Sequence, residues 1–511
     1  MKSNRIIVLI ILGFFFAFSS IISINLSLNN SEFCSDNGNL KISAVSGKIH
    51  IDGNSGWATF RAAGNCTGEG TYSEPYVIED LVIDGGGSGS CIKIENSNVY
   101  FKIENCTVYN GGGDVPDPLF GPNPISHAGD AGIHLYNVTH ALLFNNTCND
   151  SDLTLQSRFY GILLLNSYNN TITRNLVTQS QFVGIGGIIV SMSNNNVLTE
   201  NIVNDGEIAL IQSNNSIVSG NIMNVDSVDG LLLIYCINTT VTGNNITNRA
   251  LGELEAGIKL IHSDYNNISK NIAKQRIDCV GIKNNTISGN IIENNNYGPG
   301  INLYSCYNNT IEENTINDNT GEGIRIRDSD CNLILRNNLT NNTVGISFQY
   351  YSPPSYFSHD DYNIVLGNTI TNNRQYGIWF QEDSSFNLIF NNTFIGNSIH
   401  AVDNGTGNQW NSPYKIIYTY KGTNYTNYFG NYWDNYTGND ANNDGIGDTA
   451  FILNVVIDNY PLMEPIENYI FIGIYESPEA TEKGIPGYNI FILLGIVSIA
   501  SILISKKVKK S

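Results

Sequence analysis

Ile311-Glu-Glu-Asn314-Thr-Ile316 is one copy of the six-residue motif that decides the fold of this chain. The motif consists of an apolar residue, two variable residues, an asparagine, one further residue and a second apolar residue. Its asparagine returns at intervals of 19 to 31 residues, which is the spacing of a repeat architecture. The asparagines of the successive copies are Asn146, Asn175, Asn201, Asn221, Asn244, Asn271, Asn290, Asn314, Asn337, Asn368 and Asn392.

A second motif lies between successive asparagines, a glycine followed by alternating apolar residues, as in Gly257-Ile-Lys-Leu and Gly323-Ile-Arg-Ile. Alternation with a period of two predicts short β-strands. One unit cannot bury its own apolar face, whereas stacked units can, at roughly 4.8 Å per layer. A coil of about 23 residues at roughly 3.3 Å per residue gives a circuit of about 75 Å. The sequence therefore predicts a narrow parallel β-helix.

The recurring asparagine is expected at a tight inward corner of each coil. Asparagine tolerates left-handed backbone conformations, and its amide both donates and accepts hydrogen bonds. Identical side chains stacked from layer to layer would satisfy one another and the backbone of the bend. The asparagines are therefore predicted to form one buried ladder.

This pattern resembles the parallel β-helix repeats of the family named for the periplasmic copper-binding protein NosD, from about Ile49 to Pro465. The resemblance implies a right-handed coil, and the relatives include carbohydrate-binding and sugar-hydrolysing β-helices and archaeal surface proteins. The predicted fold class is all-β, a right-handed parallel β-helix solenoid with caps at both ends, an N-terminal signal segment and a C-terminal transmembrane helix. One solenoid can carry many chemistries, so the fold does not assign a function.

The chain divides by composition into a long repeat body between two apolar ends. Residues 1–24, basic and then apolar, are predicted to be a secretory signal, with an uncleaved anchor as the alternative. The apolar residues 488–505 followed by lysines predict a membrane span whose basic tail lies inside the cell. The remaining boundaries are a cap at 25–130, regular repeats at 131–402, an aromatic-rich cap over the last coil at 403–466, a linker at 467–487 and the tail at 506–511.

Charge and cysteine content narrow the possible partners. The formal charge of −20 argues against nucleic acid or anionic lipid as a partner of the body. Nine cysteines without a CxxC pair argue against a metal cluster. Copper requires soft or imidazole ligands, and the seven histidines form no close cluster in the sequence, so no copper site is predicted. One disulfide among Cys66, Cys91 and Cys106 is compatible with an exported chain, and its pairing stays open.

The longest excursion from the repeat, residues 349–361, is the main ligand-site candidate. Sugar rings stack on aromatic faces, while acids and histidine bond hydroxyl groups. The alternative is a loop whose aromatic rings pack back onto the coil. The ligand-binding candidates are Tyr350, Tyr351, Tyr356 and Phe357, and the catalytic candidates are His359, Asp360 and Asp361.

Glycosidic hydrolysis needs two carboxyl groups facing each other, which makes Asp360 and Asp361 the acidic pair to test. Arg327 is the other charged residue of interest on the shaft. It is expected to form an ion pair with Asp328 or Asp330 at a solvated edge.

A calcium loop is predicted near the C-terminal end of the body. Oxygen donors at alternate positions around a glycine turn can converge on Ca²⁺. The predicted ligands are Asp440, Asn442, Asp444, the carbonyl of Ile446, and Asp448. The segment resembles the loops of dockerins and thrombospondin type 3 repeats. It lacks the bidentate glutamate of an EF-hand, because Phe451 occupies position twelve, and an Asp/Asn/Gly turn without a metal is the alternative.

Together these features predict an exported protein tethered to the outer face of the cell membrane by a single C-terminal span. Its expected role is structural or carbohydrate-binding, with glycans and the membrane as partners. The alternative is a polysaccharide hydrolase or lyase on the same scaffold. Sequons such as Asn308-Asn-Thr make N-glycosylation possible on an exported chain.

Overall fold

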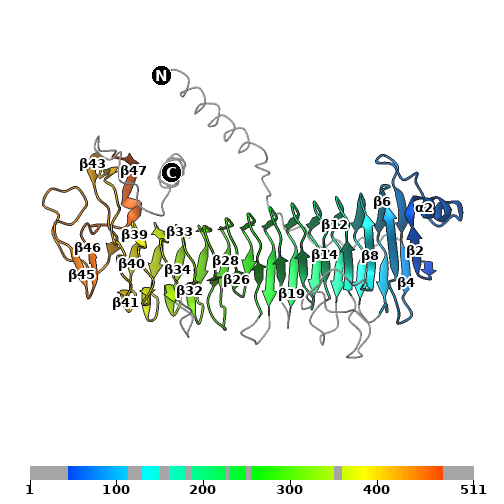
Figure 1. Ribbon diagram of the computed structural model, residues 1–511, viewed down its shortest axis with the longest axis horizontal. Helices are drawn as coiled ribbons and strands as arrows, with labels where there is room; N and C mark the ends of the chain where they lie inside the picture. Colours follow the sequence, from blue (N-terminus) through cyan, green and yellow to red (C-terminus); the bar gives the residue numbers. More distant parts are fainter. Residues whose placement is uncertain are drawn as a thin grey trace, which may run out of the picture. The chain divides into compact units, whose positions relative to one another are not determined.

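The computed structural model describes residues 44–112, 129–149, 160–178, 186–225, 229–248, 255–349 and 359–475. These residues wind into coils that stack along one axis, each contributing one strand to each of three parallel sheets (Figure 1). Within these three sheets, each strand pairs in parallel with its equivalents in the neighbouring coils, which confirms the predicted parallel β-helix. We name the sheets A, B and C, and each coil runs through B, then C, then A.

Sheet B contains the glycine-led strands of the second sequence motif. Its strands are β2 (Ile49–Asp52), β5 (Ile92–Ser97), β8 (Ala131–Val138), β11 (Tyr160–Leu165), β14 (Ile188–Ser191), β17 (Ile208–Ile211), β20 (Leu231–Ile234), β23 (Ile258–Ile261), β26 (Ile277–Val280), β29 (Ile301–Tyr304), β32 (Glu322–Arg327), β35 (Val344–Gln349), β38 (Tyr376–Phe380) and β41 (Ile399–Asp403).

Sheet C follows each sheet B strand after a short corner. Its strands are β3 (Tyr76–Glu79), β6 (Phe101–Glu104), β9 (Ala141–Phe144), β12 (Thr171–Thr173), β15 (Val197–Thr199), β18 (Ile217–Ser219), β21 (Thr240–Thr242), β24 (Asn267–Ser269), β27 (Thr286–Ser288), β30 (Thr310–Glu312), β33 (Leu333–Leu335), β36 (Ile364–Leu366) and β39 (Leu388–Phe390).

Sheet A completes each coil. Its strands are β1 (Ala44–Ser46), β4 (Leu81–Asp84), β7 (Thr107–Tyr109), β10 (Thr147–Asn149), β13 (Leu176–Thr178), β16 (Ile202–Asn204), β19 (Ile222–Val225), β22 (Asn245–Asn248), β25 (Ile272–Ala273), β28 (Ile291–Glu293), β31 (Thr315–Asn317), β34 (Asn338–Thr340), β37 (Thr369–Thr371), β40 (Thr393–Ile395) and β44 (Tyr432–Trp433).

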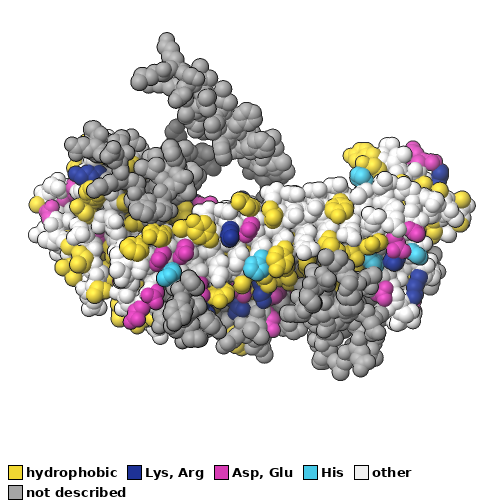
Figure 2. Space-filling view, in the orientation of Figure 1, with side chains coloured by type: hydrophobic (Ala, Val, Ile, Leu, Met, Phe, Trp, Pro, Cys, Tyr) yellow, Lys and Arg dark blue, Asp and Glu magenta, His cyan; other side chains and the backbone are white. Residues whose placement is uncertain are grey.

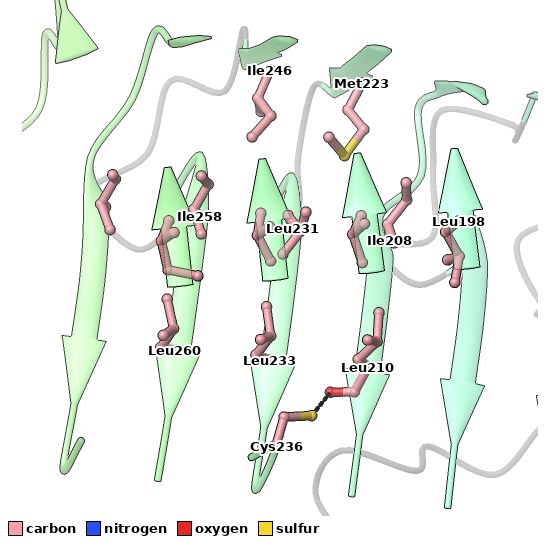
Figure 3. Close-up of a cluster of buried hydrophobic side chains, with 14 of the residues drawn as sticks. Leu198, Ile208, Leu210, Met223, Leu231, Leu233, Cys236, Ile246, Ile258 and Leu260 are labelled. Carbon is pink, nitrogen blue, oxygen red and sulfur yellow. Dashed lines mark hydrogen bonds between the residues drawn. The ribbon is translucent and has the colours of Figure 1, made fainter. Parts of the chain in front are cut away.

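The core is a column of branched aliphatic side chains that point inward from all three sheets. In sheet B, Ile208 lies beside Leu231, and Leu231 lies beside Ile258 in the next coil. Figure 3 shows this stacking, together with the thiol of Cys236 donating to the carbonyl of Leu210 at 3.2 Å. These inward side chains are fully buried, so each coil closes the apolar surface that its neighbours would otherwise expose.

The predicted asparagines form one ladder at the corner between sheets C and A. Each side-chain nitrogen donates to the side-chain oxygen of the next asparagine at 2.9 to 3.0 Å. The same oxygen accepts the backbone N–H of the preceding rung, as between Asn314 and Asn337 at 3.0 Å. Asn392 donates to one further rung, Asn431, at 2.9 Å.

The left-handed backbone falls on the residue before each ladder asparagine, where the sequence reasoning placed it on the asparagine itself. Glu200, Lys270 and Arg336 have φ of 56°, 57° and 51°, and Gly289 has φ of 61°. The ladder asparagine keeps an ordinary backbone because its N–H must point along the stack to reach the next side-chain oxygen. Residues with side chains accept the strained conformation here because the surrounding hydrogen bonds fix the corner.

Two further ladders occupy the other corners and were not predicted. Asn285 and Asn309 belong to the ladder between sheets B and C, where the backbone N–H of each residue donates to the next side-chain oxygen. Asn295 and Asn319 belong to a shorter ladder between sheets A and B. The members lie five residues before and five residues after the predicted asparagines, so a five-residue spacing of Asn was the signal available in the sequence.

A glycine opens most of the sheet B strands, where it is needed for close packing. A Cβ atom on Gly345 would lie 2.4 Å from the carbonyl oxygen of Gly377 in the next coil and 2.7 Å from a methyl carbon of Ile370. At a position as crowded as that of Gly345, only glycine fits.

The N-terminal end of the body is closed by α2 (Gly53–Ala62), inserted between β2 and β3. Its Trp57 is fully buried and stacks on Tyr76 with ring centroids 5.2 Å apart. Regular coils already begin at β2, within the stretch 25–130 that the sequence reasoning assigned to a cap. The cap is therefore one helix on an otherwise regular first coil (Figure 1).

The C-terminal segment does two different things. Trp410, Trp433 and Phe451 join the central core and close the last coil, as predicted for a lid. The hairpin β45 (Phe451–Leu453) and β46 (Val456–Asp458) belongs to this lid. The antiparallel sheet of β42 (Ile416–Tyr420), β43 (Thr423–Asn427) and β47 (Tyr469–Ile474) instead covers the outward face of sheet C.

The boundary predicted at residue 467 therefore needs correction. β47 lies inside the stretch 467–487 that composition suggested as a linker, and it follows a short 3₁₀ turn, η1 (Ile466–Asn468). Its Phe471 packs in the same apolar cluster as Leu388 and Phe390 of β39. The cap thus includes this strand, because the outward apolar residues of sheet C need a cover.

The eight cysteines of the described residues are all free. The disulfide considered among Cys66, Cys91 and Cys106 is therefore absent. Cys91 and Cys106 fill the core, and burial raises the pKa of each of these two thiols to about 11. These cysteines act as small apolar residues.

The predicted signal (1–24) and membrane span (488–505) lie outside the described residues. Across the ranges that the structure describes, no helix combines the length and the apolar character needed to cross a bilayer.

Candidate functional site

The aromatic residues of the predicted ligand loop, Tyr350, Tyr351, Tyr356 and Phe357, lie outside the described residues. The catalytic candidates that follow them are described. His359 is exposed, whereas Asp360 is only 2% exposed and lies at the corner between sheets B and C.

Asp360 and Asp361 bond to the corners of neighbouring coils. The backbone N–H of Ser329 donates to Oδ1 of Asp360 at 2.9 Å, and burial holds the pKa of this carboxyl well above its usual value. Oδ1 of Asp361 accepts the backbone N–H of Ser385 at 2.8 Å. Both carboxylates therefore act as rungs of the corner rather than as a pair across a substrate groove.

The predicted calcium loop folds around its own carboxylates. Asp440 accepts the backbone N–H groups of Asp444 at 3.1 Å and Gly445 at 2.8 Å. Asp444 accepts the N–H of Ile446 at 2.8 Å, and Asp448 accepts the N–H of Ala441 at 2.7 Å. The side chain of Asn442 bonds to Asp444 as well. Five of the six carboxylate oxygens of Asp440, Asp444 and Asp448 thus accept a hydrogen bond within the loop.

The outward face of sheet B changes character along the axis. From β11 to β20 it presents an apolar column in which Leu163, Ile189, Ala209 and Leu232 pair in register. These side chains form a cluster of their own, separate from the core. From β23 onward the same column is polar, with Lys259, Asp278, Asn302, Arg325, Ser347 and Trp379 in successive coils.

We call this polar part, from β23 to β38, the sheet B band. Charged and amide side chains within it are fixed by one another. Lys259 pairs with Asp229 at 3.2 Å, and Asn302 donates to Asp278 at 2.8 Å. On the face seen in Figure 2, charged side chains are few, and most of the surface is neither charged nor apolar.

In the C-terminal half of the band, one arginine bonds directly to a carboxylate, and a second arginine is linked to the same carboxylate by a glutamine. Arg325 bonds to Glu322 at 2.6 Å, and Gln349 donates to the other oxygen of Glu322 at 2.7 Å. Gln349 in turn accepts a hydrogen bond from Arg327 at 3.2 Å. Burial, and then the charge of Arg325, lower the pKa of the Arg327 guanidinium. Arg327 therefore lies within a network on sheet B and not at the solvated edge expected for it.

A line of exposed tyrosines borders the band along the corner between sheets B and C. Tyr265 and Tyr307 are 61% and 49% exposed. Tyr235 is 52% exposed, and its ring stacks on His262 with centroids 5.4 Å apart. Tyr304 ends β29 beside Arg327. Rings in alternate coils lie about 10 Å apart along the axis.

His134 occupies the same outward column of sheet B nearer the N-terminus, between Lys93 and Leu163. It is 1% exposed, and neither ring nitrogen has a hydrogen-bond partner. Burial, and then the charge of Lys93, lower its pKa to about 4. The ring is therefore neutral at pH 7, next to the ion pair that Lys93 forms with Glu95 at 2.9 Å.

Sequence reasoning missed the band because its residues are single variable positions in different repeats. In Gly257-Ile-Lys259-Leu and Gly323-Ile-Arg325-Ile, the residue between the two apolar positions faces outward. Aligning the glycine motifs would have placed these residues in one column, since strand alternation sends them to the same face.

Comparison with known proteins agrees with this architecture. The model of the family described as "Periplasmic copper-binding protein (NosD)" matches residues 251–355 and 283–438. The model described as "Right handed beta helix region" matches residues 90–273. No curated protein matches the chain.

Several solved structures are similar to this chain. The periplasmic alginate epimerase AlgG is 14% identical with a TM-score of 0.44, covering 64% of this chain and 85% of its own. The A-module of the Azotobacter vinelandii mannuronan C-5 epimerase AlgE4 is 14% identical with a TM-score of 0.37, covering 65% and 88%. The Dettilon tailspike protein is 13% identical with a TM-score of 0.40, covering 72% and 68%.

The copper ligands that the family description implies do not fit the described residues. No group of three or more His, Cys, Asp or Glu side chains converges there in a way that could hold a metal ion. Burial raises the pKa of the Cys236 thiol to about 11, which disfavours the thiolate that would bind copper. His140, the histidine nearest to His134 in sequence, packs its ring against Tyr100.

The fold consists of repeats that stack from coil to coil. The matches of the two family models lie between residues 90 and 438 of this stack. The handedness stated by the second model agrees with the predicted right-handed coil. The body of this chain is therefore a right-handed parallel β-helix, and its repeats are similar to those of the NosD family.

Proposed function

We propose that this chain is an exported, membrane-tethered β-helix that binds carbohydrate along the sheet B band. Export is supported by the basic and apolar N-terminus and by a family described as periplasmic. The apolar residues 488–505 followed by lysines support a single C-terminal tether.

The observation that carries the binding role is the combination of exposed rings and fixed polar groups on consecutive coils. Tyr265 and Tyr307 present faces on which sugar rings can stack. Asn302, Arg325 and Gln349 hold donors and acceptors in set positions beside them. A chain of sugars lying along the axis would meet a ring in alternate coils and polar groups in the coils of β29, β32 and β35.

The test compares tyrosines that border the band with one that does not. We expect Tyr265→Ala and Tyr307→Ala to weaken retention of the full chain on immobilised polysaccharides by roughly tenfold each, because each removes one stacking face worth about 1–1.5 kcal/mol. Tyr72→Ala is the matched control, since Tyr72 is 83% exposed on the first coils, far from the band in sequence. Equal retention by all three variants would reject the proposal.

A polysaccharide-cleaving enzyme is the alternative, and His134 is the observation that favours it. A neutral imidazole beside a lysine provides the two residue types of a lyase, in which a base removes a proton next to a uronate carboxylate bound by a cation. Because the His134 ring is 1% exposed, it would have to be uncovered before a polymer could reach it. Incubation with polygalacturonate and alginate should then shorten the polymers, and His134→Ala should abolish this while Asp360→Asn retains it. Unchanged polymer length with the natural chain would exclude the alternative for these two substrates.

Calcium at loop 440–448 remains part of the proposal, with one added requirement. The carboxylate oxygens of Asp440 and Asp444 already accept backbone N–H groups, so they would have to direct their remaining lone pairs to one common point. Calorimetric titration with Ca²⁺ should give heat that Asp444→Ala abolishes. No heat with the natural chain would show that the loop is a metal-free turn.

A further inference from the structure

We propose that the sheet B band selects neutral, hydroxyl-bearing glycans over acidic ones such as polyuronates or sulfated polysaccharides. This inference rests on the proposed carbohydrate-binding function and specifies its ligand class. It follows from how the charges of the band are paired.

Each cationic side chain of the band already has an acidic neighbour. Lys259 pairs with Asp229 at 3.2 Å, and Arg276 pairs with Asp278 at 3.5 Å. Arg325 forms the shortest of these pairs, with Glu322 at 2.6 Å. The side chains of these pairs are between 10% and 24% exposed, so water screens them only in part.

Arg327 is the remaining cation of the band, and it too lies among acids. Its guanidinium is influenced by Glu322, Asp328 and Asp360, and it bonds to Gln349. The side-chain nitrogen of Gln349 in turn donates a hydrogen bond to the carboxylate of Glu322. The cations on the sheet B strands of the band, Lys259, Arg325 and Arg327, therefore lie beside Asp229, Glu322 and Asp328, and Arg276 next to β26 lies beside Asp278, so the charges of these four cations are matched.

An acidic glycan would have to displace these internal partners. Its carboxylates or sulfates would also approach Asp278 and Glu322 on a chain whose formal charge is −20. Like charges brought together in a partly buried setting repel by kilocalories per mole rather than tenths. Acidic ligands are therefore selected against by the arrangement itself.

A neutral glycan meets a favourable surface. The ion pairs and amides hold one another in place, so their free donor and acceptor positions need little ordering on binding. Sugar hydroxyls can donate to the carboxylate oxygens and accept from the guanidinium and amide N–H groups. Trp379, in the column next to Ser347, adds an aromatic face at the end of the band.

The first experiment measures binding of the full chain to neutral dextran and galactomannan and to acidic polygalacturonate and heparin, each at 50 mM and 500 mM NaCl. We expect binding to at least one neutral polymer, with less than about a twofold change between the two salt concentrations because no net charge is involved. Tyr265→Ala and Tyr307→Ala should reduce this binding.

The second experiment removes one carboxylate from the band, so that the band carries a net positive charge. Glu322→Gln keeps a hydrogen-bonding group beside Gln349 but leaves Arg325 and Arg327 without their shared carboxylate. This variant should gain binding to polygalacturonate of about tenfold at 50 mM NaCl, and the gain should vanish at 500 mM NaCl. Glu200→Gln is the matched control, because it frees Arg174 from an exposed ion pair away from the band. It should gain nothing.

The outcomes separate the two proposals. Binding of polygalacturonate or heparin by the natural chain that is lost in Arg325→Gln would overturn the neutral-ligand inference while leaving carbohydrate binding intact. A Glu322→Gln variant that stays folded and gains no polyanion binding would also overturn it. Failure of every polymer to bind the natural chain would overturn carbohydrate binding itself.

Discussion

The side chain of a single ladder asparagine such as Asn337 makes four hydrogen bonds in the core of the corner. Its side-chain nitrogen donates to the carbonyl of Ile311 and to the side chain of Asn368. Its side-chain oxygen accepts both the N–H and the side-chain nitrogen of Asn314. Because the site excludes water, each partner left alone costs about 1–3 kcal/mol. We expect Asn337→Ala to lower the free energy of unfolding by at least about 3 kcal/mol, as measured by urea denaturation.

The neighbouring asparagine provides the control. Asn338 is exposed on sheet A and accepts one hydrogen bond from Thr340. Asn338→Ala should change stability by less than about 0.5 kcal/mol. Equal effects of the two substitutions would mean that the ladder does not stabilise the stack.

Asp458 ends the ladder with a buried carboxylate. It accepts the N–H of Asn431 at 2.7 Å and the indole N–H of Trp433 at 2.9 Å. Burial raises its pKa from 3.8 to about 6. Because the folded pKa is above the unfolded one, the folded state binds this proton more tightly. Protonation of Asp458 therefore stabilises the folded state. This contribution is fully present below the unfolded pKa and is lost as pH rises through about 6.

Acidification from pH 7 to pH 5 should therefore stabilise the chain through Asp458 by about 1 kcal/mol. Other carboxyl groups titrate in the same range, so the measurement is a difference. Urea unfolding of the natural chain and of Asp458→Asn at both pH values isolates this group. If both chains show the same change with pH, the carboxyl does not titrate in this window.

Among the side chains, polarity by itself was a poor guide to the site. Asp360 and Asp361 are acidic and follow an aromatic loop in the sequence, but they bond to corner backbone. Lys259 and Arg325 stand alone in their own repeats, and only the pairing of strands brings their column together. The site could not be predicted from residue type because its members are 66 residues apart in the chain.

At the scale of elements, α2 does the work of a cap. Trp57 lies against Tyr76 and also against Phe101, with ring centroids 4.7 Å apart in the second case. Without it, the first coil would expose core and unpaired strand edges. Trp57→Ala should lower the free energy of unfolding by about 3–5 kcal/mol. It should also cause association detectable by light scattering, whereas Tyr72→Ala should leave the chain monodisperse to the same degree as the unsubstituted chain.

Sequence composition predicted some of the strands but not the role of each strand near the C-terminal end. Alternation and turn residues predicted the short strands well, because each strand faces the core with every second residue. The same signals did not distinguish the strands that close the last coil from those of the sheet β42, β43 and β47. That sheet forms because outward Leu366 and Phe390 of sheet C need apolar cover, a requirement that appears only after the coils are stacked.

For the whole molecule, one coil is the unit that can be removed. Deleting residues 291–314 would join Asn290 to Thr315, which occupies the register position of Ile291. Since each coil contacts only its neighbours, the shortened chain should keep its β-sheet circular dichroism and a cooperative unfolding transition. Deleting only residues 291–302 should abolish folding, because half a coil places inward residues outside. Survival of the half-coil deletion would contradict the register described here.

The sequence by itself determined the coil. The spacing of asparagine and glycine specifies where the chain turns, and alternation specifies which residues face inward, since both depend on neighbours within a few positions. The tertiary structure alone decided which outward residues meet, which corner holds each acid and which apolar face is covered. Within the regular repeats these contacts join residues 19 to 31 positions apart, and the cover of sheet C joins Phe390 to Phe471, so they depend on the register between whole coils and not on any local pattern.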